Sequence, residues 1–226
     1  MRGVAPGRVV VNPLAPSGWG VYLVTDRAQT GGRALIDVVG AALQGGIRAV
    51  QLRERDMSAR ELLALAVRLR ESTRAAGAAL LINDRVDVAL ACDADGVHLP
   101  AGSDPAASRA LLGPDKLIGV SLHTVTEAEA IDRSVVDYAI AGPAFETPSK
   151  PGYGPEIGHK GLAEIARAAP VPVLAIGGLN ATRAAEVLAA GPRGIAVMGS
   201  IMRAVDPGQE VRALLAIVAG AHPRAR

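Results

Sequence analysis

The alternation of two kinds of segment along this chain constrains its fold more than any other feature of the sequence. Eight short segments are apolar and rich in β-branched residues, and each is followed by a longer helical stretch. Short, continuous apolar runs are typical of strands buried on both faces of a parallel sheet. The eight candidate strands are residues 21–25, 49–52, 80–82, 96–99, 117–120, 138–141, 171–176 and 194–198.

The longer segments carry signals that mark the start of a helix. Ser58 and Glu61 form a capping box, and the leucines and alanines that follow fall on one side of a helix over residues 58–76. Thr126 and Glu129 repeat this spacing after the fifth candidate strand, so we expect a second capping box there.

Eight strand–helix units in 226 residues predict a single-domain (β/α)8 TIM barrel, a fold with a typical length of about 250 residues. The competing fold is a doubly wound open sheet, which is also parallel. No G-x-G-x-x-G motif opens the first helix, and eight repeats favour closure. We expect the barrel domain over residues 18–221, an N-terminal extension over 1–17 and a C-terminal tail over 222–226.

Composition excludes several classes of function. Only five residues are aromatic, which argues against carbohydrate or single-stranded nucleic acid, because both stack on aromatic faces. A net charge of +2 is too small for a nucleic-acid-binding surface. No apolar run reaches the roughly 20 residues of a membrane-spanning helix, and residues 1–17 lack the features of a signal peptide. The single cysteine fits a reducing compartment, so we expect a cytoplasmic protein; a homo-oligomer is compatible with the sequence.

Glycines follow the last two candidate strands. Gly177 and Gly178 come after the seventh strand, and Gly199 with Ser200 after the eighth; each pair leads into a helix. Backbone N–H groups and helix dipoles can bind an anion at such turns, and TIM barrels repeatedly place a phosphate there. The alternative is that these glycines only make tight turns.

The second candidate strand runs into a cluster of polar residues. Alternation along the strand directs Gln51, Arg53 and Arg55 to the same side. Two neighbouring guanidinium groups suit a diphosphate or a carboxylate ligand. The alternative is that the arginines form solvated ion pairs with Glu54 or Asp56.

Two further residues suit a phosphorylated ligand. Asp84 ends the third strand and could bind Mg²⁺, which takes one or two carboxylates together with phosphate oxygens and water. Its alternative role is to cap a helix that begins near Arg85. Lys150 lies in a Pro/Gly-rich loop over residues 148–155 that is long enough to act as a lid, or else is simply solvated.

Two histidines follow or lie within strands. We expect His98, inside the fourth strand, to pack rather than react. His123 points to the same face as Ser121 and could serve as an acid–base group, although a structural role is the alternative.

Several short motifs at these positions belong together. They are Val-Gln-Leu-Arg-Glu at 50–54, Ile-Asn-Asp-Arg at 82–85, Asp-Gly-Val-His-Leu at 95–99, Gly-Val-Ser at 119–121, Asp-Tyr at 137–138, Gly-Pro at 142–143, Thr-Pro-Ser-Lys at 147–150 and Ala-Ile-Gly-Gly-Leu at 175–179. Over roughly residues 20–203 the chain resembles the thiamine phosphate synthase and TenI-like thiazole tautomerase family, whose members are (β/α)8 barrels.

The resemblance implies an activity and a set of site residues. A synthase of this family uses Mg²⁺ to join hydroxymethylpyrimidine diphosphate to thiazole phosphate, which gives thiamine phosphate and pyrophosphate. By resemblance, the residues that hold the pyrimidine are Gln51, Asn83 and Lys150; those that hold its diphosphate are Arg53, Arg55 and Ser121; Asp84 binds Mg²⁺; and those that hold the thiazole phosphate are Thr147, Ser149, Gly178, Met198 and Gly199.

The chain departs from the synthase pattern at two positions. The synthases carry Lys where this chain has Arg55, which keeps the charge but changes the geometry. They also carry a second Mg²⁺-binding Asp five residues after the His that matches His98. Here that position is Ser103, and Asp104 follows it. Either a one-residue shift brings Asp104 to the metal, or the second ligand is missing.

A tautomerase is the main alternative function. The local sequences at 99–103, 121–123 and 145–147 are more similar to the tautomerases, in which the His that matches His123 is the acid–base residue for the thiazole carboxylate phosphate. A tautomerase handles no diphosphate and has no need of Gln51, Asn83 and Asp84 together, so we favour the synthase. A non-catalytic sensor of thiazole or thiamine phosphate is a third interpretation.

Overall fold

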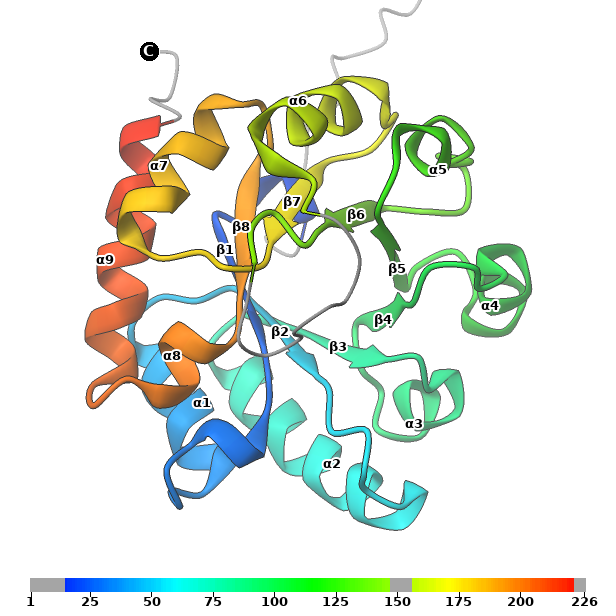
Figure 1. Cartoon of the computed structure of the whole chain (residues 1–226). Coiled ribbons are helices and arrows are strands. Elements are labelled where there is room, and N and C mark those ends of the chain that lie inside the picture. Colours follow the sequence, from blue (N-terminus) through cyan, green and yellow to red (C-terminus); the bar gives the residue numbers. More distant parts are fainter. Residues whose placement is uncertain (1–14, 147–155, 222–226) are drawn as a thin grey trace, which may run out of the picture.

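The computed structural model describes residues 15–146 and 156–221 and shows a closed barrel of eight parallel strands (Figure 1). The strands are hydrogen-bonded in chain order, and β8 pairs with β1 to close the barrel. This confirms the predicted TIM-barrel fold. The strands are β1 (Val21–Val24), β2 (Ala49–Leu52), β3 (Ala79–Asn83), β4 (Gly96–Leu99), β5 (Leu117–Leu122), β6 (Tyr138–Ala141), β7 (Val173–Ile176) and β8 (Gly194–Val197).

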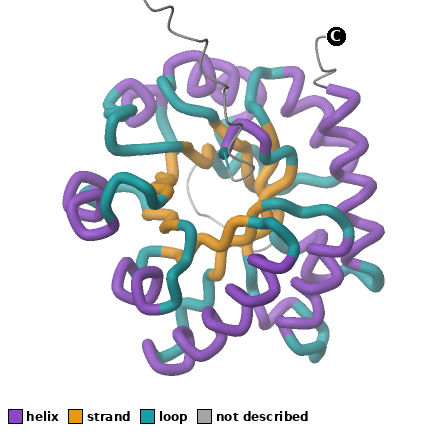
Figure 2. The backbone as a smooth tube through the Cα atoms, turned by 180° about the vertical axis from the view of Figure 1, so that it is seen from behind, coloured by secondary structure: helices purple, strands orange, loops and turns teal. Residues whose placement is uncertain are grey.

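A helix follows each strand, and the helices form a ring outside the strands (Figure 2). None of the helices in the described ranges is long and apolar enough to cross a membrane. The α-helices are α1 (Leu35–Gln44), α2 (Ala59–Ala75), α3 (Val86–Ala91), α4 (Pro105–Leu112), α5 (Val125–Glu129), α6 (Gly158–Ala168), α7 (Ala181–Ala189), α8 (Gly199–Arg203) and α9 (Pro207–Ala221).

The two expected capping boxes have different outcomes. Ser58 and Glu61 form the predicted box at the start of α2. The box at Thr126 and Glu129 is wrong, because α5 begins two residues earlier than the pattern suggested. Thr124 has the extended backbone of an N-cap and accepts a hydrogen bond from the Glu127 backbone, so the box is formed by this pair.

Three aromatic residues fill the barrel interior near the N-terminal ends of the strands. The rings of Trp19, Tyr22 and Tyr138 lie with centroids 5.1–5.9 Å apart, and the two tyrosine hydroxyls are 3.0 Å apart. All three side chains are fully buried. Gly119 on β5 leaves the space that the Tyr138 ring occupies, since a Cβ there would overlap it. The rings therefore pack this end of the barrel and leave the C-terminal end for a ligand.

Candidate functional site

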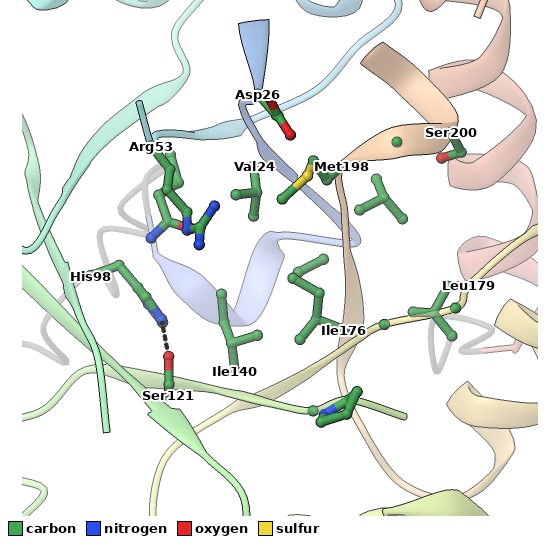
Figure 3. A pocket seen from close by; sticks show the side chains of 18 of the residues that line it. Val24, Asp26, Arg53, His98, Ser121, Ile140, Ile176, Leu179, Met198 and Ser200 are labelled. Carbon is green, nitrogen blue, oxygen red and sulfur yellow. Dashed lines mark hydrogen bonds between the residues drawn. The ribbon is translucent and has the colours of Figure 1, made fainter. Parts of the chain in front are cut away.

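A cavity of about 640 Å³ lies at the C-terminal ends of the strands (Figure 3). Residues on or directly after each of the eight strands line it, from Val24 on β1 to Ser200 after β8. Its volume falls within the range of small-molecule sites.

Nine of the predicted site residues line this cavity, which brings together positions far apart in the sequence. They are Gln51, Arg53, Arg55, Asn83, Ser121, His123, Gly178, Met198 and Gly199. Three more, Thr147, Ser149 and Lys150, lie outside the described residues. Their individual roles stay predictions, because position alone does not assign a ligand.

Polar contacts fix the β2 side of the cavity. The buried Gln51 amide donates to Asn83 Oδ1 at 3.2 Å. Thr25 Oγ1 accepts from the Arg53 backbone N–H at 3.0 Å and donates to the buried Glu54 carboxylate at 2.7 Å. These contacts fix the C-terminal ends of β2 and β3. The residues predicted to bind the pyrimidine and the diphosphate therefore face the same cavity.

Glu54 and Asp56, the alternative partners expected for the β2 arginines, form ion pairs with Arg27 instead. Arg27 donates to Glu54 through both its backbone N–H and its guanidinium, and it forms a two-pronged pair with Asp56 at 2.6 and 2.7 Å. The hydrogen bonds that Arg27 donates to Asp56 and Glu54 raise its pKa above the usual value. Both candidate carboxylates thus pair with Arg27, while Arg53 and Arg55 line the cavity.

His98 is buried in the cavity wall beside Ser121. Its Nε2 lies 3.0 Å from Ser121 Oγ (Figure 3), and its ring packs against Tyr138 with centroids 5.7 Å apart. Burial and the nearby Arg53 charge lower its pKa to about 3, so the imidazole is neutral. Nδ1 is buried and has no hydrogen-bond partner among the described residues.

The unpartnered Nδ1 assigns the tautomer of His98. A buried N–H donor without a partner is less tolerable than a buried lone pair, so we assign the proton to Nε2. Nε2–H then donates to Ser121 Oγ and leaves the serine O–H to donate to a ligand. His98 packs as expected, and it also orients Ser121 toward the cavity.

His123 has the opposite tautomer. Its Nδ1 lies 2.5 Å from the carbonyl oxygen of Gly142. Because a carbonyl only accepts hydrogen bonds, Nδ1 carries a proton, and the neutral ring has its lone pair on Nε2. This is the form that a general base needs, and His123 lines the cavity.

Asp84 does not cap α3, so this alternative role is wrong. The helix begins at Val86, and its N-cap residue Arg85 makes no side-chain capping bond. Asp84 has a left-handed backbone (φ 64°), and its N–H donates to the carbonyl of His98 at 2.9 Å. Its carboxylate is exposed, and no side chain in the described part of the chain donates a hydrogen bond to it. Asp84 is not among the residues that line the main cavity, so its role as a Mg²⁺ ligand stays a prediction.

Asp104 is placed differently. Its Oδ1 caps α4 by accepting from the backbone N–H groups of Ala106 and Ala107 at 2.9 and 3.1 Å. It lines a neighbouring cavity of about 330 Å³ rather than the main one. Within the two described ranges, no three His, Cys, Asp or Glu side chains are grouped to hold a metal ion. A Mg²⁺ at Asp84 would therefore depend largely on substrate oxygens and water, as Mg²⁺ commonly does.

The glycines after β7 shape the turn into α7, and they also contribute to the cavity wall. Gly177 and Gly178 both have positive φ (107° and 63°), and a Cβ on Gly178 would lie 2.6 Å from the carbonyl oxygen of Glu146. The side chain of Asn180 caps α7 by accepting from the Arg183 backbone at 3.0 Å. These glycines therefore make a tight turn and also line the cavity, and their binding of a phosphate stays a prediction.

Two arginines in the cavity wall were not predicted from the sequence. Arg183 on α7 and Arg203 on α8 line the cavity next to the β7 and β8 turns. The site residues of a TIM barrel are expected at strand ends, whereas these side chains reach back from helices. Arg203 stands four residues after Gly199, and residues at this spacing share one helix face. That spacing is the signal that could have found it.

Comparison with known proteins shows which family this chain is similar to. The thiamine monophosphate synthase family model matches residues 21–201. The thiamine-phosphate synthase of Roseiflexus castenholzii is 49% identical over 93% of this chain and 94% of the relative. The putative thiamine-phosphate synthase of Geobacter sulfurreducens is 48% identical over 91% of this chain and 97% of its own.

A solved structure agrees with these sequence matches. The thiamine phosphate pyrophosphorylase of Pyrococcus furiosus superposes with a TM-score of 0.81 at 35% identity, over 90% of this chain and 96% of that one. With a family model that spans the barrel and relatives at nearly half identity, the chain belongs to the thiamine monophosphate synthase family.

Proposed function

We propose that this chain is a thiamine-phosphate synthase, a transferase that joins hydroxymethylpyrimidine diphosphate to thiazole phosphate and releases pyrophosphate. One observation carries the proposal. A single cavity holds the Gln51–Asn83 pair and two arginines on the β2 and β3 side, together with Gly178 and other turn residues on the β7 and β8 side. Such a cavity can bind a diphosphate and a monophosphate substrate together.

The β2 side would bind and activate the diphosphate. Arg53 and Arg55 would stabilise the negative charge that develops on the leaving oxygen. Ser121, oriented by His98, would donate its hydroxyl proton to a phosphate oxygen. Asp84 would hold Mg²⁺, which when bound supplies further positive charge to the pyrophosphate. Gln51 and Asn83 would hydrogen-bond the edge of the pyrimidine.

The reaction needs no protein nucleophile. The bond between the pyrimidine methylene carbon and the diphosphate oxygen breaks, and the oxygen keeps the electron pair. The aminopyrimidine shares the positive charge left on the methylene, and the thiazole nitrogen forms the new C–N bond. The work of the protein is to position the two substrates and to stabilise the departing charge.

Direct assay tests this function. The purified protein, incubated with both substrates and Mg²⁺, should produce thiamine phosphate and pyrophosphate in equal amounts. Folding is monitored by circular dichroism in the same buffer. A folded protein that yields neither product would contradict the proposal.

A second candidate function is thiazole tautomerase, and the tautomer of His123 favours it. With Nδ1–H bound to the Gly142 carbonyl, Nε2 can move a proton on the thiazole carboxylate phosphate. We expect His123→Ala to abolish isomerisation if this activity is present. An unchanged rate in that variant would exclude His123 as the acid–base residue.

The setting of the enzyme is part of the proposal. We infer one barrel domain over residues 18–221, Mg²⁺ as cofactor, and phosphorylated small molecules as ligands. The single, buried Cys92 supports a reducing, cytoplasmic location. Gel filtration tests whether the chain forms a homo-oligomer.

A further inference from the structure

A guanidinium group lies in the cavity wall beside the β8–α8 turn, where the sequence indicated only backbone contacts to a phosphate. It belongs to Arg203, the last residue of α8. We propose that Arg203 is the side chain that recognises the phosphate of the thiazole substrate and so selects its phosphorylated form. This inference rests on the proposed synthase function and adds a residue that determines its specificity.

Gly199 provides the space for this guanidinium. A Cβ on Gly199 would lie 2.6 Å from Arg203 Nη2 and 2.7 Å from Cζ. Gly199 does not have a positive φ, so it leaves room for the guanidinium rather than meeting a backbone requirement, and a side chain there would push the arginine away. The Arg203 guanidinium therefore lies against the turn that was expected to bind the phosphate.

Residues after β1 hold Arg203 in this position. Its Nη1 donates to Gln29 Oε1. The Gln29 amide nitrogen in turn donates to Asp26 Oδ2 at 2.6 Å and lies 3.2 Å from the sulfur of Met198. Figure 3 shows Asp26 and Met198 on the same side of the cavity. These contacts orient the Gln29 carbonyl toward Arg203, so the guanidinium is positioned before a ligand arrives.

Among the described residues, Arg203 is held by an amide and not by an ion pair. Gln29 is neutral, and no carboxylate of residues 15–146 or 156–221 forms an ion pair with Arg203. Arg27, two residues before Gln29, is by contrast paired with two carboxylates. A guanidinium held by an amide keeps its positive charge and most of its N–H donors for an anion, and its planar fork matches a phosphate.

The two proposed anion subsites contain different arginine side chains. Arg53 and Arg55 extend from the end of β2, whereas Arg203 stands after β8, and β1 lies between these two strands. The diphosphate and the monophosphate would thus each have cationic side chains of their own. Arg203 would contribute to binding of the thiazole substrate only.

Kinetics with two thiazole substrates test this role. Arg203→Gln removes the charge and keeps a polar side chain. We expect kcat/KM for thiazole phosphate to fall by about 10- to 100-fold, mainly through KM, as for loss of a charged hydrogen bond. With the unphosphorylated thiazole alcohol, kcat/KM should not change, because the alcohol lacks the group that Arg203 binds. The KM for the pyrimidine diphosphate should also stay constant.

Control variants sharpen the result. Arg203→Lys keeps the charge without the planar fork and should lose less than Arg203→Gln. Arg212→Gln, an exposed arginine on α9 outside the cavity wall, should leave every constant unchanged. Gln29→Leu should raise the KM for thiazole phosphate in the same direction as Arg203→Gln.

Two outcomes would overturn the inference. An equal loss with thiazole phosphate and the alcohol would mean that Arg203 only supports the fold of α8. A raised KM for the pyrimidine diphosphate instead would place Arg203 in the diphosphate subsite. Calorimetric titration of thiazole phosphate into wild type and Arg203→Gln requires no turnover. Weaker binding by the variant would therefore support Arg203 even if the wild type formed no thiamine phosphate, and equal binding would contradict it.

Discussion

The buried side chain of His98 makes the stability of the protein depend on pH. Its side chain is 4% exposed, and burial together with Arg53 lowers its pKa to about 3. In the unfolded chain the same imidazole titrates near 6.5. Between these values the unfolded state binds a proton that the folded state does not. The stability that His98 contributes is present above pH 6.5 and is lost as the pH falls toward 3.

This linkage predicts the behaviour of His98→Asn. Each protein is unfolded with urea at pH 7 and at pH 5 in metal-free buffer, and the two free energies of unfolding are subtracted. We expect the loss between these pH values to be about 2 kcal/mol smaller in the variant, at about 1.4 kcal/mol per pH unit below 6.5. Equal losses in the two proteins would show that His98 is not held neutral.

We expect substitution of Asp84 by asparagine to lower turnover without lowering stability. Asp84→Asn removes the carboxylate, and we expect turnover to fall on the order of 100-fold, as for loss of one charge-stabilising group. Asparagine tolerates the left-handed backbone at this position, and the side chain is exposed, so the free energy of unfolding should change by less than about 0.5 kcal/mol.

Asp84→Ala is the contrasting variant. Alanine disfavours a positive φ, so we expect it to lose about 1 kcal/mol of stability in addition to turnover. Urea unfolding measures the stability, and release of pyrophosphate measures the turnover. Severe unfolding of Asp84→Asn would instead indicate a structural role for the carboxylate.

The direction of side chains in the site was predictable where backbone geometry decides it. The alternation of β2 correctly indicated that Gln51, Arg53 and Arg55 face one side. The partners of the neighbouring carboxylates were not predictable, because Arg27 reaches Glu54 across 27 positions of sequence. No local pattern encodes which arginine pairs with Glu54 and Asp56.

At the scale of elements, the start of α5 shows where local signals are ambiguous. Thr124 with Glu127 and Thr126 with Glu129 have the same spacing, and only the first pair forms the capping box. Local sequence does not distinguish them, because the choice depends on where β5 ends and on how α5 packs on the barrel. The sequence therefore predicted the helix but misplaced its start.

Two matched substitutions test the cap. Thr124→Ala removes the side-chain acceptor for the Glu127 N–H and should lower the free energy of unfolding by about 1 kcal/mol. Thr126→Ala lies within the helix on an exposed position and should change it by less than about 0.5 kcal/mol. Urea denaturation of both variants gives the comparison, and the reverse order would contradict the assigned cap.

At the scale of the whole molecule, the barrel itself was predictable from the eight alternating units. Buried parallel strands are continuously apolar, and closure gives each of the eight strands a hydrogen-bonded neighbour on both sides. Strand boundaries differ from the expected ones by at most two residues. The aromatic packing inside the barrel was not predictable. Tyr22 and Tyr138 are 116 positions apart, and only closure of the barrel brings their hydroxyls together.

We propose that one barrel mouth holds two phosphorylated groups in separate subsites. A crystal structure of the protein with thiamine phosphate, pyrophosphate and Mg²⁺ tests it most directly. We predict pyrophosphate against Arg53 and Ser121 with the metal at Asp84, and the phosphate of thiamine phosphate at Gly178 and Arg203. A thiamine phosphate whose phosphate lies against Arg53, or ligands bound outside the cavity, would contradict this arrangement.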